Sequence, residues 1–132
     1  MGARSKARKR ALDILFESEL RGLEVGATLP ERRSDAEPAL NDYTVTLVEG
    51  VAAHAEEIDQ LISAHSTAWP LERMPAIDRN ILRIGVFELR HVDSVPDGVA
   101  LSEAVSLAQD LSTDDSAGFV NGVLAGIAHR SG

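Results

Sequence analysis

The side chains that could act as catalytic bases, nucleophiles or metal ligands are spread thinly along this sequence. The four histidines, His54, His65, His91 and His129, are never spaced one helical turn apart, and no HExxH pattern occurs. The chain has no cysteine, which excludes disulfides and thiolate metal sites and is typical of a reducing cytoplasm. The G-x-S-x-G, P-loop and G-x-G-x-x-G patterns of common enzyme sites are also missing. The sequence therefore predicts no catalytic residue, no metal site and no cofactor.

Charge is the second chemical signal, and it is unevenly distributed. The first ten residues, MGARSKARKR, contain no acidic residue and five of the 13 basic ones, namely Arg4, Lys6, Arg8, Lys9 and Arg10. The remaining 122 residues hold eight basic and 21 acidic residues, a formal charge of −13 within a net charge of −8. A basic segment on an acidic body predicts a polyanionic partner for that segment. For so short a run, a frayed and solvated terminus is the alternative.

The basic segment continues directly into a helical pattern, which determines how its charges are held. Apolar residues recur at i, i+3 and i+4 spacing after the segment, and Gly22 and Gly26 mark the end of the helix. We therefore expect a helix over residues 4–21, with Arg4 and Arg8 one turn apart on a rigid support. This arrangement favours a binding role over a loose tail.

The next part of the chain begins with a loop and returns to helix. Residues 24–40 are rich in turn residues and are expected to form a surface loop with one helical turn. Apolar spacing then predicts a helix that is capped by Asn41 and broken near residues 50–54. The β-branched run 43–48 also fits a strand, but the longer helical periodicity favours the helix.

The second half of the sequence is helical as well. A connector with two prolines precedes a stretch, residues 78–91, whose apolar side chains cover most of a helix surface, as expected of a central buried helix. A turn and an amphipathic helix ending near residue 111 follow. The sequence thus predicts a single all-α domain over residues 1–132, with six or seven short helices.

The segment TDDSAGFVNGVLAG contains two conflicting signals. Apolar spacing predicts a helix over residues 116–128, whereas Asn121-Gly122 is typical of a hairpin turn and glycine is a poor helix former. Because the periodicity continues through this pair, we expect a helix. Gly118, Gly122 and Gly126 form a stripe along it, and we expect the stripe to allow close packing of a neighbouring helix.

The start of that last helix offers a second interpretation. Asp114, Asp115 or Ser116 is expected to cap it. Free backbone N–H groups at this end favour a phosphate, and Phe119 would offer a nucleobase a platform, although the aspartates would repel a polyanion. From the residues alone, close packing is the stronger explanation of the glycines.

Hydropathy excludes a membrane span or a secretory leader among these residues. The chain is 44% hydrophobic and 26% charged, as is ordinary for a soluble globular domain. Its first apolar run, Leu12 to Phe16, is interrupted and followed by acidic residues, and it is too short for a signal peptide or a membrane helix. We expect a soluble cytoplasmic protein.

Three stretches resemble one known family. RSKARKRALDILFESEL near the start, ERMPAIDRNILRIGVFEL in the middle and ALSEAVSLAQDLSTDDSAGFVNGVL near the end are similar to the NusB family of transcription antitermination factors. The resemblance covers about residues 4–128, and its most specific part is two acidic residues and a serine followed by Phe-Val-Asn-Gly-Val-Leu. Residues 24–40 do not match closely, which is typical of a variable loop.

The resemblance implies a fold and a function. The fold would be two packed helical subdomains, and the role would be non-enzymatic: binding the boxA element of ribosomal and other leader RNA with ribosomal protein NusE, within an antitermination complex on RNA polymerase. The RNA-binding positions would be Arg4, Lys6, Arg8, Lys9 and Arg10 in an arginine-rich motif, with Asp115 and Phe119 in the last helix. The NusE-facing position would be Asp78.

The sequence departs from the family pattern in places and leaves alternatives. Gly118 stands where some members have a basic residue, and His65 lies only near the position where some have an RNA-contacting tyrosine. A protein-interaction module with little RNA affinity, acting through helix faces around Asp78 and Asp115, is the second hypothesis. NusB-like domains also precede some RNA cytosine methyltransferases, but that activity needs a catalytic extension with a cysteine. A homodimer is also compatible with the family and would cover the basic helix.

Overall fold

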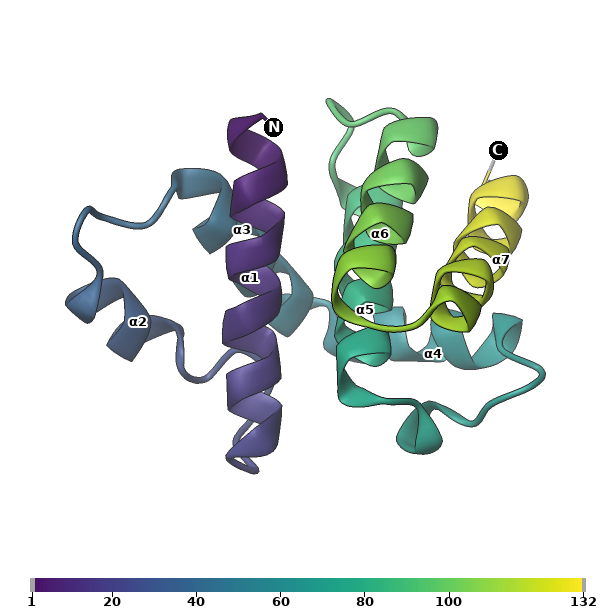
Figure 1. Ribbon diagram of the computed structural model, residues 1–132, viewed down its shortest axis with the longest axis horizontal. Helices are drawn as coiled ribbons and strands as arrows, with labels where there is room; N and C mark the ends of the chain where they lie inside the picture. Colours follow the sequence, from purple (N-terminus) through teal and green to yellow (C-terminus); the bar gives the residue numbers. More distant parts are fainter. Residues whose placement is uncertain (1, 132) are drawn as a thin grey trace.

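The computed structural model describes residues 2–131 of the chain (Figure 1). Its regular elements are seven α-helices and one short 3-10 helix, which confirms the predicted all-α class. In chain order they are α1 (Ala3–Leu20), α2 (Leu29–Asp35), α3 (Asp42–Ala53), α4 (Ala55–His65), η1 (Leu71–Arg73), α5 (Ala76–His91), α6 (Asp97–Leu111) and α7 (Asp114–Ser131). None of the helices in this described part is long and apolar enough to cross a membrane.

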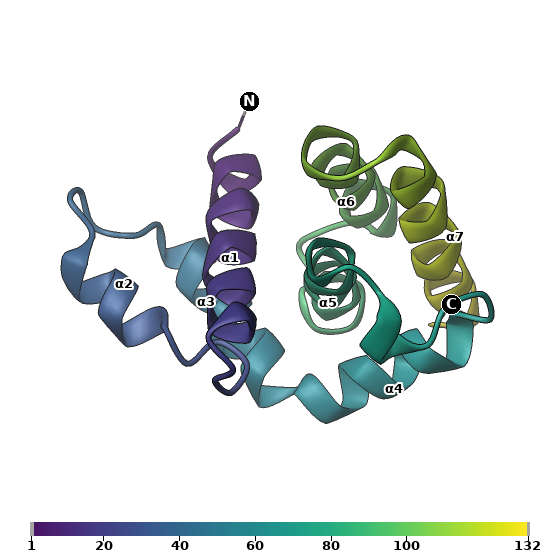
Figure 2. The same cartoon turned by 60° about the horizontal axis from the view of Figure 1, so that its bottom comes forward.

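Helix α5 is the axis of the fold. Every residue from Ile81 to Glu88 is buried, which confirms the expectation that this mostly apolar helix is central. It packs against α1 and α3 on one side and against α6 and α7 on the other, while α4 runs beneath it (Figure 2). Helices α1, α2 and α3 therefore form one group (Figure 1). Helices α4, α6 and α7 form a second group together with α5.

The predicted cap and break of the second helical stretch are both present. The Asn41 side chain accepts a hydrogen bond from the backbone N–H of Tyr43 at 2.7 Å, so the run 43–48 lies in helix rather than in a strand. Helix α3 ends at Ala53 and α4 begins at Ala55, with His54 alone between them. This break allows the chain to turn beneath α5.

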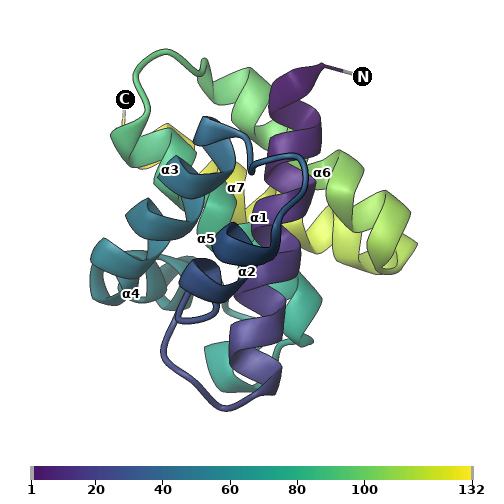
Figure 3. The same ribbon diagram turned by 90° about the vertical axis from the view of Figure 1, so that its left-hand side faces the viewer.

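Helix α1 ends in a backbone motif that requires glycine. Gly22 has a φ of +69°, and the N–H of Leu23 donates to the carbonyl of Ser18 at 2.9 Å, as in a Schellman motif. The following loop is tied back to α1 because the N–H of Thr28 donates to Ser18 Oγ at 3.1 Å. It then forms α2, which is longer than the predicted single turn and lies outermost, in front of α1 and α3 in Figure 3.

Helix α7 is continuous through Asn121-Gly122, so the helix prediction is confirmed, but it begins earlier than expected. Thr113 Oγ1 accepts a hydrogen bond from the N–H of Ser116 at 3.1 Å, and Thr113 is therefore the capping residue in place of the three that follow it. The glycine stripe is largely exposed. A Cβ added at Gly118 or Gly122 would meet no atom within 4 Å, so close packing does not explain these two glycines.

Gly126, the third member of the stripe, does pack closely, because a Cβ there would lie 3.1 Å from the His65 side chain in α4. Tighter helix contacts lie at two other glycines. A Cβ on Gly50 of α3 would lie 2.1 Å from the ring of Phe87 in α5, and one on Gly85 of α5 would lie 2.7 Å from the Leu124 side chain in α7. Both glycines let a large side chain of the neighbouring helix reach the backbone. Hence α3 and α7 each pack closely against α5, because a glycine in one of the two helices leaves room for a side chain of the other.

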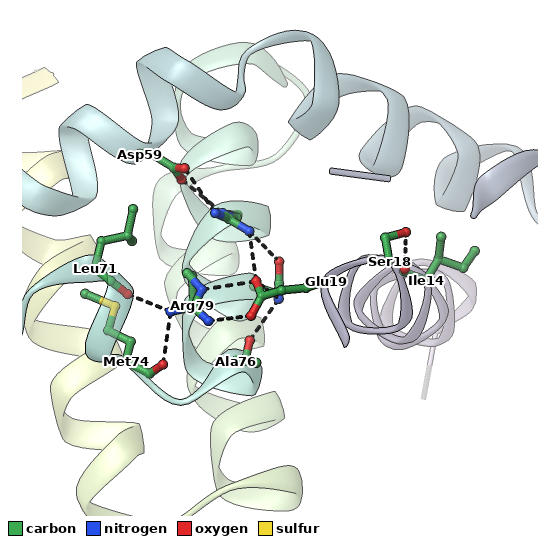
Figure 4. A network of polar contacts seen from close by, with 10 residues as sticks. Ile14, Ser18, Glu19, Asp59, Leu71, Met74, Ala76 and Arg79 are labelled. Carbon is green, nitrogen blue, oxygen red and sulfur yellow. Dashed lines mark hydrogen bonds and ion pairs between the residues drawn. The ribbon is translucent and has the colours of Figure 1, made fainter. Parts of the chain in front are cut away.

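A network of ionic hydrogen bonds joins the C-terminal end of α1 to α5 (Figure 4). The Glu19 carboxylate accepts hydrogen bonds from two nitrogens of Arg79, from Asn80 at 3.3 Å and from Arg83 at 3.3 Å. Burial raises the pKa of Glu19, but the hydrogen bonds and charges of these partners outweigh it, so the pKa lies below its ordinary value. Glu19 is therefore ionised at neutral pH and binds α5 electrostatically.

The two arginines extend this network to further elements. Arg79 Nη1 donates to the carbonyl of Leu71 at 2.6 Å and to that of Met74 at 3.0 Å, in the connector before α5 (Figure 4). Arg83 donates to both carboxylate oxygens of Asp59 in α4, at 2.9 and 3.0 Å. Four elements, namely α1, α4, α5 and the connector with η1, thus meet at one charged cluster.

The glycine contacts predict opposite effects of the same substitution. Gly50→Ala should lower the free energy of unfolding by about 1–3 kcal/mol, because its Cβ would overlap the Phe87 ring. Gly122→Ala should raise it by about 0.5–1 kcal/mol, because alanine favours helix and the position is open. Denaturant unfolding of both variants checks this. Equal changes in the two variants would contradict the packing described here.

Candidate nucleic-acid interface

The basic segment forms the first turns of α1 and borders a groove between α1 and α6. Lys6 and Lys9 are exposed there, and Arg10 is partly buried. The groove has a volume of about 810 Å³ and is lined by Ser5, Lys6, Arg8, Lys9, Arg10, Asp13, Glu103, Ser106, Leu107 and Asp110. Three acidic residues thus oppose the basic ones, and Lys6 and Lys9 are the exposed cations among the residues that line the groove.

Arg8 lies in the interior, whereas the sequence places it among the cations predicted to contact RNA. Its side chain is 4% exposed, and its Nε lies 3.0 and 2.9 Å from the two carboxylate oxygens of Glu88 in α5. Its Nη1 donates to Glu103 of α6 at 2.7 Å. If Arg8 turned outward to a phosphate, Glu88 would be left buried without its counter-ion. Arg8 therefore holds α1 against α5 and α6.

Tyr43 completes this cluster and connects it to Arg4. The Tyr43 hydroxyl donates to Glu88; burial raises the pKa of Tyr43, and the hydrogen bond to Glu88 and its negative charge raise the pKa further. The Arg4 guanidinium carbon lies 4.3 Å from the centroid of the Tyr43 ring, a cation–π distance, and Nη1 donates to Ser94 Oγ at 3.3 Å. Arg4 is thus held in place while it remains exposed.

An aromatic pair marks the start of α7. The Phe119 ring is partly buried and meets the edge of Trp69 at a centroid distance of 5.3 Å and an interplanar angle of 86°. Trp69 is 39% exposed and lies in the connector between α4 and η1. Asp115, one turn before Phe119, is exposed as well. The pair offers an aromatic surface to solvent beside one carboxylate.

Sequence reasoning missed Trp69. Its only signal was a single tryptophan in a polar connector with two prolines, a position that carries no periodicity. His65, which the sequence placed near a possible RNA contact, is partly buried, and its Nδ1 lies 2.9 Å from the carbonyl oxygen of Leu61. Trp69 is therefore the more accessible ring of the two.

Asp78 is also placed differently from the sequence prediction. It is fully buried, and its two carboxylate oxygens accept hydrogen bonds from Ser112 Oγ at 2.8 Å and Ser116 Oγ at 2.7 Å. These serines flank the turn between α6 and α7, so Asp78 fixes the start of α7 from inside the molecule. A partner on the surface cannot reach this carboxylate as it is arranged, so an effect of Asp78 on the predicted NusE contact would act through the start of α7.

The structure brings the predicted RNA-binding residues onto two separate surfaces. Lys6, Lys9 and Arg10 lie on α1, whereas Asp115 and Phe119 lie on α7. Helix α6 stands between these two helices (Figure 1). A ligand that contacts both surfaces must therefore be long enough to cross α6, as a strand of nucleic acid is.

Comparison with known proteins agrees with this architecture. The family model described as the NusB family matches residues 5–129. A transcription antitermination protein NusB from Nocardioides sp. is 57% identical over 130 residues, covering 98% of this chain and 96% of the relative.

Solved structures are similar over almost the whole length. NusB from T. maritima is 30% identical with a TM-score of 0.83, and the match covers 97% of this chain and 92% of that chain. A structure of antitermination factors NusB and NusE in complex with dsRNA is 31% identical with a TM-score of 0.82, and the match covers 96% of both chains. The helical arrangement described above is therefore shared with these proteins.

The burial of Arg8 predicts a loss of stability when it is replaced. Arg8→Met should lower the free energy of unfolding by about 3 kcal/mol, because it leaves Glu88 buried and uncompensated. Lys9→Met, on the same helix but exposed, should change it by less than about 0.5 kcal/mol. Denaturant unfolding monitored by circular dichroism measures both. An Arg8→Met protein as stable as the Lys9→Met control would show that the ion pair is not structural.

Proposed function

Because the chain belongs to the NusB family, we propose that it is a transcription antitermination factor that binds single-stranded boxA-type leader RNA, notably of ribosomal RNA operons. It would do so together with ribosomal protein NusE, in a complex on RNA polymerase, and without catalysing a reaction. One observation supports this most directly: cations exposed on the first turns of α1 belong to a chain that is otherwise strongly acidic. Such a surface attracts phosphate, while the rest of the protein repels it.

The proposed RNA contacts divide by chemistry. Lys6, Lys9 and Arg10 would neutralise phosphates along the α1–α6 groove, and Arg4 would do so from its place over the Tyr43 ring. Arg8 would not take part. Single-stranded RNA also presents unstacked bases, which bind aromatic side chains independently of sequence. The Trp69–Phe119 pair would provide that stacking surface, and Asp115 beside it could accept a hydrogen bond from a base edge.

Partner binding would compensate for the acidic body. With eight basic and 21 acidic residues outside the first ten, the protein repels RNA over most of its surface, so a basic partner such as NusE would raise the affinity of the pair. The NusB–NusE complex with dsRNA among the similar structures supports this partnership. We assign Asp78 an indirect role, because it orients the start of α7 through its two serine hydrogen bonds.

The alternative, a protein-interaction module with little RNA affinity, rests on two observations. Arg8 is neutralised inside the protein, and three acidic residues line the same groove as Lys6, Lys9 and Arg10. Binding of NusE without any RNA binding by the pair would favour this alternative. A homodimer that covers the α1–α6 groove would hide the same residues, and light scattering with and without RNA distinguishes that case.

The phosphate contacts predict a salt-dependent affinity. If four phosphates are neutralised, log K for a boxA-like RNA should fall with log[salt] at a slope of about −3. Lys9→Gln should reduce that slope by about 0.7, and Lys6→Gln/Lys9→Gln by about 1.4. Arg33→Gln, which removes one exposed charge on α2, is the matched control and should leave the slope unchanged. Equal effects of Lys9→Gln and Arg33→Gln would disprove the assignment to α1.

The aromatic pair predicts a different signature. Trp69→Ala should weaken RNA binding by about 1–3 kcal/mol without changing the salt slope, because stacking releases no counterions. Leu20→Ala, which truncates an exposed apolar side chain at the end of α1, should leave the affinity unchanged. Fluorescence anisotropy of a labelled RNA measures both variants. Full RNA affinity in Trp69→Ala would remove this surface from the proposed site.

A further inference from the structure

Three side chains with metal-binding groups lie together at the break between α3 and α4. His91 Nε2 lies 2.8 Å from Glu57 Oε1, and His54 Nδ1 lies 3.5 Å from the same oxygen. The rings of His54 and His91 are stacked with centroids 3.8 Å apart. One potential ligand atom from each of the three residues lies within 4.8 Å of the others. Sequence spacing predicted no metal site, because His54 and His91 belong to different helical segments.

The fold holds this cluster, which we call the His54–Glu57–His91 cluster, from three directions. His54 occupies the break between α3 and α4, Glu57 lies in the first turn of α4, and His91 is the last residue of α5. The Phe87 ring lies behind both imidazoles, with centroids 6.1 Å from His54 and 5.6 Å from His91. Phe87 is itself fixed against Gly50. The two imidazoles therefore rest on a rigid aromatic support.

The donor set selects a class of ion. Imidazole nitrogens suit Zn²⁺, Cu²⁺ and Ni²⁺, whereas Mg²⁺ and Ca²⁺ prefer sites made of oxygen atoms. Two histidines and one glutamate are also a ligand set known for zinc, with water in the fourth position. We propose that His54, Glu57 and His91 form a binding site for one divalent transition-metal ion such as Zn²⁺, completed by water.

Binding requires a small rearrangement of the cluster. Zn–N and Zn–O bonds of about 2.0–2.2 Å place neighbouring tetrahedral ligand atoms about 3.3 Å apart. The His91 Nε2–Glu57 Oε1 pair at 2.8 Å must therefore open, and His54 Nδ1, 3.5 Å from the same oxygen, must move slightly closer. The imidazole planes, tilted by 18°, must also open so that their nitrogens converge on one point. Side-chain rotation suffices for this, because the three side chains are 41%, 42% and 27% exposed for His54, Glu57 and His91.

The charges at the cluster include one that favours a cation and one that opposes it. Glu57 has a lowered pKa, chiefly because of its hydrogen bond to His91, with smaller contributions from the charges of His91, His54 and Arg90. Its carboxylate is therefore ionised at neutral pH and available as a ligand. Arg90 is the one of these groups that opposes a metal ion without being able to bind it. We accordingly expect a site weaker than a closed structural zinc site.

Titration of the untagged, full-length chain with ZnCl₂ tests the proposal. We expect one saturable Zn²⁺ site by isothermal titration calorimetry, a rise in melting temperature with Zn²⁺, and neither effect with MgCl₂. Removing even an outer partner of a metal ligand costs about 10–100-fold in affinity, so His54→Gln/His91→Gln should lose at least that much. His129→Gln, which alters an exposed histidine of α7, is the matched control and should bind as the wild type does.

Each outcome decides the matter. Glu57→Gln keeps both rings and should fold normally, so its loss of Zn²⁺ affinity would support the site even if the double variant were unstable. Unchanged affinity in Glu57→Gln and His54→Gln would overturn the proposal, as would equal losses in His129→Gln. The proposal also fails if the wild-type chain shows no saturable binding at millimolar Zn²⁺, in which case the His91–Glu57 contact is only a protonation-dependent ion pair.

Discussion

The antiparallel contact between α1 and α5 is the constraint on which the rest of the structure depends. Arg8, near the start of α1, binds Glu88 near the end of α5, and Glu19, near the end of α1, binds Arg79 and Arg83 near the start of α5. In the first contact α1 carries the positive residue, and in the second contact it carries the negative one. A parallel arrangement would therefore place like charges together. Apolar burial along the helices supplies the stability, whereas the charges select direction and register.

This choice of register also determines which charges can bind a ligand. Arg4 and Arg8 lie one turn apart on the same helix, yet one reaches solvent over the Tyr43 ring and the other is enclosed by carboxylates. The basic segment therefore combines a buried structural cation with exposed cations, and the first anchors the helix that presents the others. Under the proposed function, a mutation at Arg8 would weaken RNA binding through the fold alone, so RNA affinity by itself would not distinguish the two roles.

Local patterns in the sequence predicted the helices, the cap at Asn41, the break near residue 54 and the central place of α5, because each of these depends on neighbouring residues. Such patterns could not predict which residues distant in the sequence would form ion pairs or close contacts. Arg8 looks like its basic neighbours until Glu88, 80 positions away, is placed beside it. The exposed glycines of α7 likewise resembled a packing stripe, whereas the close contact was formed by Gly50, where no stripe exists. Composition shows which side chains are available but not which of them meet.

The last turn of α5 shows how one short element serves several of these features. Glu88 faces α1 and Tyr43, while His91, three residues later, faces the break between α3 and α4. Phe87, one residue before Glu88, packs its ring near His91 and against Gly50 of α3. An ion bound by the His54–Glu57–His91 cluster would therefore restrict the same turn that holds Arg8. Because α1 presents the exposed cations of the basic segment, the rigidity of that turn sets how firmly the proposed RNA-binding surface is held.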